Sequence, residues 1–216
     1  MRLCHFSDTH WRGLSRHAEY KRAFSKMFAD LRENVKPDAI VICGDIVHSK
    51  TQGISPELID HLTWWFTTMA TICDVHVILG NHDGNLMNTQ RQDAISPIIN
   101  AINNPKINLY KKSGVYSIRQ GINLCVFSLF DEDGWADVRP VKGELNIAAY
   151  HGSVRGSMTD MGWALEADKG VEFFKDFDVC LLGDVHKRQF LDYREIEIEI
   201  DEDDIHMYPG AERIGG

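Results

Sequence analysis

The chain has 216 residues, of which 44% are hydrophobic and 25% are charged, the composition of a soluble globular protein with one substantial core. No apolar run approaches the roughly 20 residues that span a bilayer, and residues 1–6 are too short and too polar for a secretory signal. We therefore expect one domain over residues 1–216, a cytoplasmic location and no membrane partner. The five cysteines form no CxxC pair and lie among apolar neighbours, which predicts reduced core residues.

The net charge of −9 is unevenly distributed along the chain. Residues 1–126 carry 14 basic and 11 acidic side chains, whereas residues 127–216 carry 9 and 21, with seven of these acids between Glu195 and Asp204. Binding to a nucleic acid depends on local charge, so the negative total does not exclude a polyanionic partner.

Short β-branched runs alternate with segments of helical periodicity, which predicts helices packed on sheets, an α/β fold. We expect strands at residues 2–6, 39–43, 75–79, 123–129, 146–150 and 178–182. The spacing of Tyr20, Phe24, Phe28 and Leu31 predicts an amphipathic helix that ends before Pro37.

Two further segments carry clear local signals. Ser55 is placed to cap a second helix, with Pro56 at its first position. Strict alternation of Glu and Ile over residues 195–200 predicts a strand with one solvated face.

Polar segments follow five of the expected strands at their carboxyl ends. The segments are residues 7–10, 44–48, 80–83, 151–152 and 183–186. Because the carboxyl ends of strands that feed helices meet along one edge of a sheet, where ligand sites form, these segments are expected to converge. Convergence would bring together Asp8, His10, Asp45, Asn81, His82, His151, Asp184 and His186.

This set of side chains predicts a metal centre. Three carboxylates gathered without a cation would repel each other and take up protons, so the set calls for bound positive charge. Imidazole mixed with carboxylate and amide oxygen, without thiolate, suits Mn²⁺, Fe or Zn²⁺ better than Ca²⁺. One metal would use about four of these ligands, so a set of this size suggests two metals that share one ligand. The glycines before Asp45, Asn81 and Asp184 fit tight turns, with positive φ or close approach of the backbone.

The ordered motifs carry a resemblance to a known family. They read Asp-x-His at residues 8–10, Gly-Asp at 44–45, Gly-Asn-His-Asp at 80–83, a lone His at 151 and Gly-Asp-Val-His at 183–186, followed by Tyr-Pro-Gly-Ala at 208–211. In them the sequence resembles the calcineurin-like metallophosphoesterase superfamily, and most closely the SbcD family of DNA-break-processing nucleases. The resemblance implies a four-layer α/β/β/α sandwich of two mixed sheets.

The same resemblance implies a role for each residue of the motifs. It implies one metal held by Asp8, His10, Asp45 and His186, and a second held by Asn81, His151, Asp184 and again Asp45. His82 would then be a catalytic residue that faces the substrate, and His48 a catalytic residue that steadies it. The cofactors would be two divalent metal ions, Mn²⁺ by preference, with Mg²⁺, Fe or Zn²⁺ as alternatives.

Two departures from the family pattern affect these expectations. Position 184 is Asp where the family usually has His, which makes the second site more anionic and favours Mn²⁺ or Mg²⁺ over softer ions. The family nucleases also continue into a DNA-capping domain and a segment that docks on an SbcC-like ATPase, and no such parts are visible here. We therefore expect a minimal nuclease or a catalytic core, with DNA as a partner and with an SbcC-like ATPase subunit and a second copy of the chain as candidate partners.

Three functions remain open at this point. The first is an SbcD-like, Mn²⁺-dependent exonuclease or endonuclease in DNA break processing or recombination. The second is a phosphoesterase that acts on a small molecule or a phosphoprotein, and the third is a scaffold that has lost catalysis, although every motif position holds a competent ligand or acid. The other histidines are expected to be structural or exposed: His5, His17, His61, His76 and His206.

Overall fold

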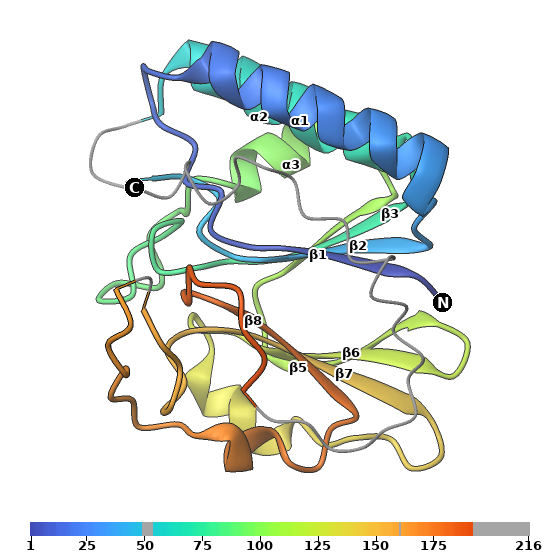
Figure 1. The fold of residues 1–216 in the computed structure, drawn as a ribbon, viewed down its shortest axis with the longest axis vertical. Coiled ribbons are helices and arrows are strands. Elements are labelled where there is room, and N and C mark those ends of the chain that lie inside the picture. Colours follow the sequence, from blue (N-terminus) through green and yellow to red (C-terminus); the bar gives the residue numbers. More distant parts are fainter. Residues whose placement is uncertain (49–53, 160, 192–216) are drawn as a thin grey trace.

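The computed structural model describes residues 1–48, 54–159 and 161–191. In these ranges two four-stranded sheets stack face to face, with helices on the outer side of the first sheet and short 3-10 helices on the outer side of the second (Figure 1). The predicted α/β sandwich is confirmed. Its fourth layer, in the described residues, is formed by η2 (Glu132–Asp137) and η3 (Val171–Phe174).

The first sheet is built from alternating strands and helices. Its parallel strands follow the order β1 (Leu3–Phe6), β2 (Ala39–Cys43), β3 (Asp74–Ile78) and β4 (Ile107–Tyr110). Between them lie α1 (His17–Asp30), which continues into the π-helical turn η1 (Leu31–Val35), then α2 (Pro56–Ala70) and α3 (Ser96–Ile102). Because consecutive strands are neighbours and such crossovers are right-handed, all the helices cover one face of the sheet (Figure 1).

The second sheet is mixed. Its order is β5 (Gly114–Arg119), β6 (Ile122–Phe127), β7 (Leu145–His151) and β8 (Val179–Gly183). Strand β5 pairs antiparallel with β6, and the other pairs are parallel. Apolar side chains fill the space between the two sheets: Val41, Cys43, Ile78, Leu124, Val126, Ile147 and Ala149. Since β6, β7 and β8 are parallel, their carboxyl ends lie at one edge of this sheet.

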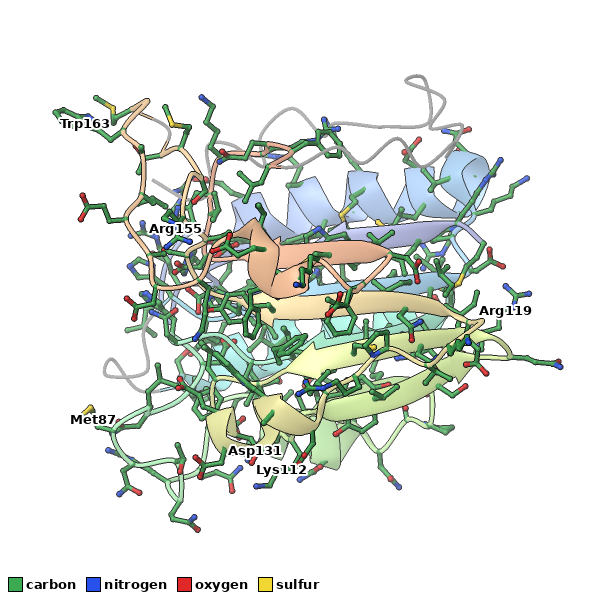
Figure 2. All side chains as sticks on the ribbon, turned by 90° about the horizontal axis from the view of Figure 1, so that it is seen from below. Met87, Lys112, Arg119, Asp131, Arg155 and Trp163 are labelled. Carbon is green, nitrogen blue, oxygen red and sulfur yellow. The ribbon has the colours of Figure 1, made fainter. Side chains whose placement is uncertain are left out.

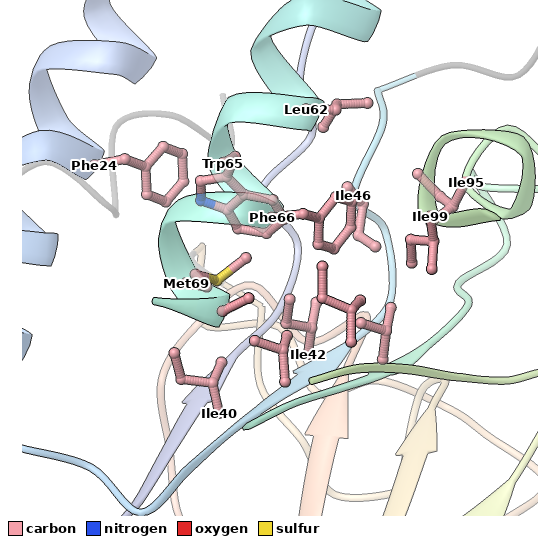
Figure 3. Close-up of a cluster of buried hydrophobic side chains, with 14 of the residues drawn as sticks. Phe24, Ile40, Ile42, Ile46, Leu62, Trp65, Phe66, Met69, Ile95 and Ile99 are labelled. Atoms are coloured by element: carbon pink, nitrogen blue, oxygen red, sulfur yellow. The ribbon is translucent and has the colours of Figure 1, made fainter. Parts of the chain in front are cut away.

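The largest hydrophobic cluster lies between the helices and the first sheet. Trp65, Phe66 and Met69 of α2 are fully buried and pack over Ile40 and Ile42 of β2 (Figure 3). The aromatic side chains that recur along one face of α1 and of α2 therefore belong to the core, as their helical spacing predicts. The packing anchors β2, whose carboxyl end leads into Asp45.

The local predictions from the sequence hold closely. All six expected strands are present, and their ends lie within two residues of those expected. Ser55 caps α2, because its hydroxyl accepts a hydrogen bond of 3.1 Å from the backbone N–H of Leu58. The first helix ends in the π-helical turn, where Lys36, in a left-handed conformation just before Pro37, closes it.

Some elements were not predicted from the sequence, and some predictions cannot be compared. Strands β4 and β5 are only partly buried, and polar residues such as Asn108 and Ser117 interrupt their apolar pattern. Helix α3 has only seven residues, too few for a clear helical period. Residues 195–200, His206 and the motif at 208–211 lie outside the described residues. The five cysteines are free thiols, as expected. Within the described ranges, none of the helices combines the length and the apolar character that a membrane span requires.

The buried face of α2 is expected to dominate stability. Phe66→Ala should lower the free energy of unfolding by about 3–5 kcal/mol, because it removes a fully buried ring and leaves a cavity. Ile59→Ala on the solvent side of the same helix should change it by no more than about 0.5 kcal/mol. Urea unfolding followed by circular dichroism measures both, and equal effects would contradict this assignment of the core.

Candidate metal centre

The loops that follow β1, β2, β3, β7 and β8 meet at the carboxyl ends of the strands. Contacts between the two sheets hold these loops together. The backbone N–H of Asp184 lies 3.1 Å from each carboxylate oxygen of Asp8, and Nδ1 of His151 donates to the carbonyl of Cys43 at 2.7 Å. This second bond holds the His151 ring with its Nε2 towards the loops of the first sheet.

The backbone at this edge is strained. Asp8, His10, Asp45 and Asp184 have φ values of 56°, 45°, 51° and 78°. Left-handed conformations are uncommon for residues other than glycine and cost on the order of 1–3 kcal/mol, although Asp and His tolerate them better than most. These four are predicted metal ligands. Such strain persists only where the surrounding structure imposes it, and it clusters at functional sites.

Three glycines allow the loops to approach closely. Among them, positive φ is found only at Gly44, at 82°. A Cβ atom on Gly44 would lie 2.6 Å from the backbone nitrogen of Gly80 and 2.6 Å from Nδ1 of His151. Side chains on Gly80 and Gly183 would likewise collide with the carboxylate of Asp45 and the ring of His151. Close approach is therefore what these positions share.

The first group of predicted ligands lies around His10. Its Nε2 is 3.3 Å from Nε2 of His186 and 3.7 Å from Oδ2 of Asp45. Oδ1 of Asp8 is 3.8 Å from Nε2 of His186. The structure thus brings together the four residues that the resemblance assigns to the first metal.

The second group lies on the other side of the Asp45 carboxylate. Oδ1 of Asp45 is 3.3 Å from Nε2 of His151, whereas Oδ2 faces His10. The side-chain oxygen of Asn81 is 3.1 Å from Nε2 of His151. Asp45 is 2% exposed and directs one oxygen towards each group, which is the geometry required of a shared ligand.

Asp184 lies at the border of the second group. Its Oδ1 is 4.0 Å from Nε2 of His151, and its Oδ2 accepts a hydrogen bond of 2.6 Å from the hydroxyl of Ser153. The hydroxyl occupies one oxygen and leaves Oδ1 directed towards the second group. The sequence contained no signal for Ser153 other than its position two residues after His151.

The donor atoms fit a bound cation. Atoms held at about 2.1 Å from one metal lie about 3.0–3.4 Å apart. Three separations within these groups, at 3.1–3.3 Å, match that range, and the other three, at 3.7–4.0 Å, are somewhat longer. The Asn81 oxygen faces both oxygens of Asp45, which can only accept, and Nε2 of His151. A cation between these atoms satisfies all of them, whereas without one the amide has to reverse so that its nitrogen donates.

The protonation states also favour a metal. Burial lowers the pKa of His10 to about 4, so its imidazole is neutral at neutral pH and can offer a lone pair. Burial acts to lower the pKa of His151 as well, but contact with Asp45 outweighs it and raises that pKa to about 9. Without a cation, a proton on His151 balances the buried carboxylate, and a bound cation would replace that charge.

One buried carboxylate was given no role by the sequence analysis. Asp83 accepts hydrogen bonds from the backbone N–H groups of Ile46, Val47 and Gly80 at 2.8, 3.0 and 2.9 Å. It therefore ties the loop after β2 to the loop after β3 and fixes the distance between Asp45 and Asn81. Burial, together with the charge of Asp45, raises the pKa of Asp83 to about 7. Its place in the Gly-Asn-His-Asp motif was the only sequence signal.

His82 lies at the rim of the first group. Its side chain is 41% exposed, with Nε2 3.9 Å from Oδ2 of Asp45. Its Nδ1 donates to the main-chain carbonyl of His48 at 2.5 Å. The His48 ring lies 5.7 Å from the ring of His10 and 6.3 Å from that of His82. In the described contacts, residue 48 orients His82 through its backbone.

The chain is similar to a known protein family and to two known proteins. Residues 1–188 match the family model described as calcineurin-like phosphoesterase, and the chain belongs to that family of metal-dependent hydrolases. It is 37% identical over 203 residues to the uncharacterized protein R555 of Acanthamoeba polyphaga mimivirus, a match that covers 88% of this chain but only 15% of that protein. The crystal structure of the Pseudomonas putida nuclease MPE is a distant match, with 15% identity, a TM-score of 0.41 and coverage of 76% of this chain and 67% of that one.

Asp45→Ala is expected to abolish Mn²⁺ binding by both groups of predicted ligands, because it removes the carboxylate that each group contacts. Isothermal titration with Mn²⁺ measures the stoichiometry, and Asp45→Asn, which keeps the volume, tests whether the fold is retained. Asp133→Ala, an exposed acid on η2, is the matched control and should bind as the wild type does. An unchanged stoichiometry in Asp45→Ala would contradict a shared ligand.

Gly44→Ala should both destabilise the protein and weaken Mn²⁺ binding, because the added methyl group meets Gly80 and His151. Gly121→Ala separates the clash of the added methyl group from the cost of a left-handed backbone conformation. Gly121 also has positive φ, at 75°, but a Cβ there has nothing within 4 Å, so only the backbone cost of about 1 kcal/mol is expected. Urea unfolding and Mn²⁺ titration of both variants check this, and equal effects would show that close approach is unimportant.

Proposed function

We propose that this chain hydrolyses phosphodiester bonds in DNA with two divalent metal ions, Mn²⁺ by preference, as an SbcD-like nuclease of DNA break processing or recombination. The observation that carries the proposal is the pairing of the two ligand groups with His82, an oriented and partly exposed imidazole beside the shared carboxylate. Ligand groups alone would serve any metal-binding protein. A proton donor at their rim would assist the departure of an alkoxide leaving group when an ester is hydrolysed.

The division of labour between cofactor and protein is simple. Bound divalent cations would supply Lewis acidity, which would neutralise charge on the phosphate oxygens and lower the pKa of a bound water well below that of bulk water. The protein supplies fixed positions. Asp83 and the glycine-lined turns hold Asp45 and Asn81 in place, so little reorganisation is needed when substrate binds.

His82 is proposed to protonate the leaving oxygen. Its Nδ1 is already engaged with the carbonyl of residue 48, so Nε2 is the nitrogen free to give a proton. The exposure of the ring allows a phosphodiester to reach it from solvent. General acid catalysis of this kind contributes typically 10²- to 10⁴-fold.

The proposal of DNA as substrate is supported by the order of the motifs and by local charge. Lys187 and Arg188 directly follow His186 and are exposed, so they can contact phosphates on either side of the reacting one. Arg16 and Arg155 are instead paired with Glu19 and Glu172. An SbcC-like ATPase subunit and a second copy of this chain remain proposed partners.

The decisive assay is release of nucleotides from end-labelled double-stranded DNA with Mn²⁺ or with chelator. His82→Ala should bind Mn²⁺ normally but lose about 10²- to 10⁴-fold in rate. His61→Ala, on α2 and outside the site, is the matched control and should digest DNA as the wild type does.

Each other result has a defined meaning. Full activity of His82→Ala would refute its role as the acid. Metal-loaded protein that cleaves a phosphomonoester such as p-nitrophenyl phosphate, but neither DNA nor a diester, would replace the nuclease by a phosphoesterase for small molecules or phosphoproteins.

A further inference from the structure

A ribbon described over residues 153–159 and 161–170 follows β7 and lies beside the groups of predicted metal ligands. Its two arms pair in antiparallel fashion through a bridge between Met158 and Ala164, and the N–H of Leu165 donates to the carbonyl of Ser157 at 2.7 Å. The N–H of Thr159 donates to the carbonyl of Trp163 at 2.8 Å. The ribbon is thus a hydrogen-bonded structure.

The ribbon is fixed to the body of the protein at two points. Val154 is fully buried in the cluster on the outer face of the second sheet. The side chain of Gln189 accepts from the N–H of Met158 and donates to its carbonyl, both at 2.8 Å. These bonds hold Met158 against the segment that carries the predicted ligands Asp184 and His186.

A cavity of about 430 Å³ lies between the ribbon and that segment. It is lined by Ser153, Met158, Thr159, Met161, Leu165, Asp184, Val185 and His186. The ribbon side combines the apolar side chains of Met158, Met161 and Leu165 with two hydroxyl residues, and the opposite side includes two predicted metal ligands, so the cavity borders the candidate metal centre. Its size lies in the range of about 300–1,000 Å³ that small-molecule sites occupy.

The tip of the ribbon extends this apolar surface into solvent. Trp163 is 73% exposed and projects from the end of the molecule (Figure 2), and Met161 is 83% exposed. Large apolar side chains exposed together next to a polar site mark a binding surface. Met158 and Leu165 are only half-buried and line the cavity, so they are available to a ligand.

We infer that this cavity binds a nucleobase of the DNA strand whose phosphate lies at the two groups of predicted metal ligands. The inference rests on the proposed function and adds a site for the base. A base has flat apolar faces, which suit thioether and aliphatic walls, and polar edges, which suit the hydroxyl of Thr159. Lys187 and Arg188 lie next to the cavity in sequence and supply the positive charge that a nucleotide needs and an apolar partner does not.

The base site is tested with three diesters that lose the same p-nitrophenolate group in the presence of Mn²⁺. Two are thymidine 5′-(p-nitrophenyl phosphate) and its 3′ isomer, and the third is methyl p-nitrophenyl phosphate, which has no base. The wild type should hydrolyse one thymidine ester in preference to methyl p-nitrophenyl phosphate. In Met158→Ala/Leu165→Ala that preference, measured as a ratio of kcat/KM values, should fall about tenfold and mainly through KM.

The control variant is Ile59→Ala/Leu145→Ala. It removes two partly exposed aliphatic side chains, one on α2 and one at the opposite end of β7 from His151, and should keep the wild-type ratio. If the wild type hydrolyses all three diesters without preference, or if the cavity variant keeps the preference, the base site is refuted while the phosphodiesterase proposal stands.

A binding measurement covers the case in which no diester is hydrolysed, which would refute the proposed function. Isothermal titration of the Mn²⁺-loaded protein with thymidine 5′-monophosphate and with inorganic phosphate compares ligands with and without a base. The cavity variant should lose about tenfold in affinity for the nucleotide relative to phosphate. An equal change for both ligands, or none, would overturn the base site.

Discussion

The structure depends on holding one buried carboxylate, that of Asp45, between two sheets. An ionised carboxylate with 2% exposure is costly unless it is paired. Here the ring of His151 faces one oxygen and the ring of His10 the other, and the backbone N–H of His82 donates at 2.8 Å to the first. Most features of the site follow from this requirement, because each neighbouring loop has to bring a donor or a cation ligand close to the same point.

The backbone adopts strained conformations where these loops converge. Left-handed conformations at four predicted ligands and the absence of a side chain at Gly44 and Gly80 let the loops after β2 and β3 approach the ring of His151. Asp83 then ties these two loops together from below through three backbone N–H groups. Stability is supplied elsewhere, by the large apolar cluster beneath α2, so the fold can tolerate strain at the edge where chemistry is proposed.

Membership of the calcineurin-like phosphoesterase family of metal-dependent hydrolases accounts for the groups of candidate ligands. Asp184 stands where the resemblance implies His, and Ser153 donates a hydrogen bond to it. The same short segment after β7 leads into the ribbon that borders the cavity. Residues 151–159 and 161–170 therefore connect the charge of the second group with the shape of the neighbouring surface, and we propose that substrate selection resides there.

The sequence by itself determined six of the eight strands found in the described residues, the first two helices and the set of residues that meet at the edge, because apolar periodicity, capping residues and polar segments at strand ends are local patterns. Only the tertiary structure showed that Asp83 links two loops, that the carbonyl rather than the ring of His48 binds His82, and that Asp45 directs one oxygen to each group. These facts rest on hydrogen bonds and contacts between residues about 35 to 105 positions apart. No local pattern encodes such distances, since they are set by how the two sheets pack.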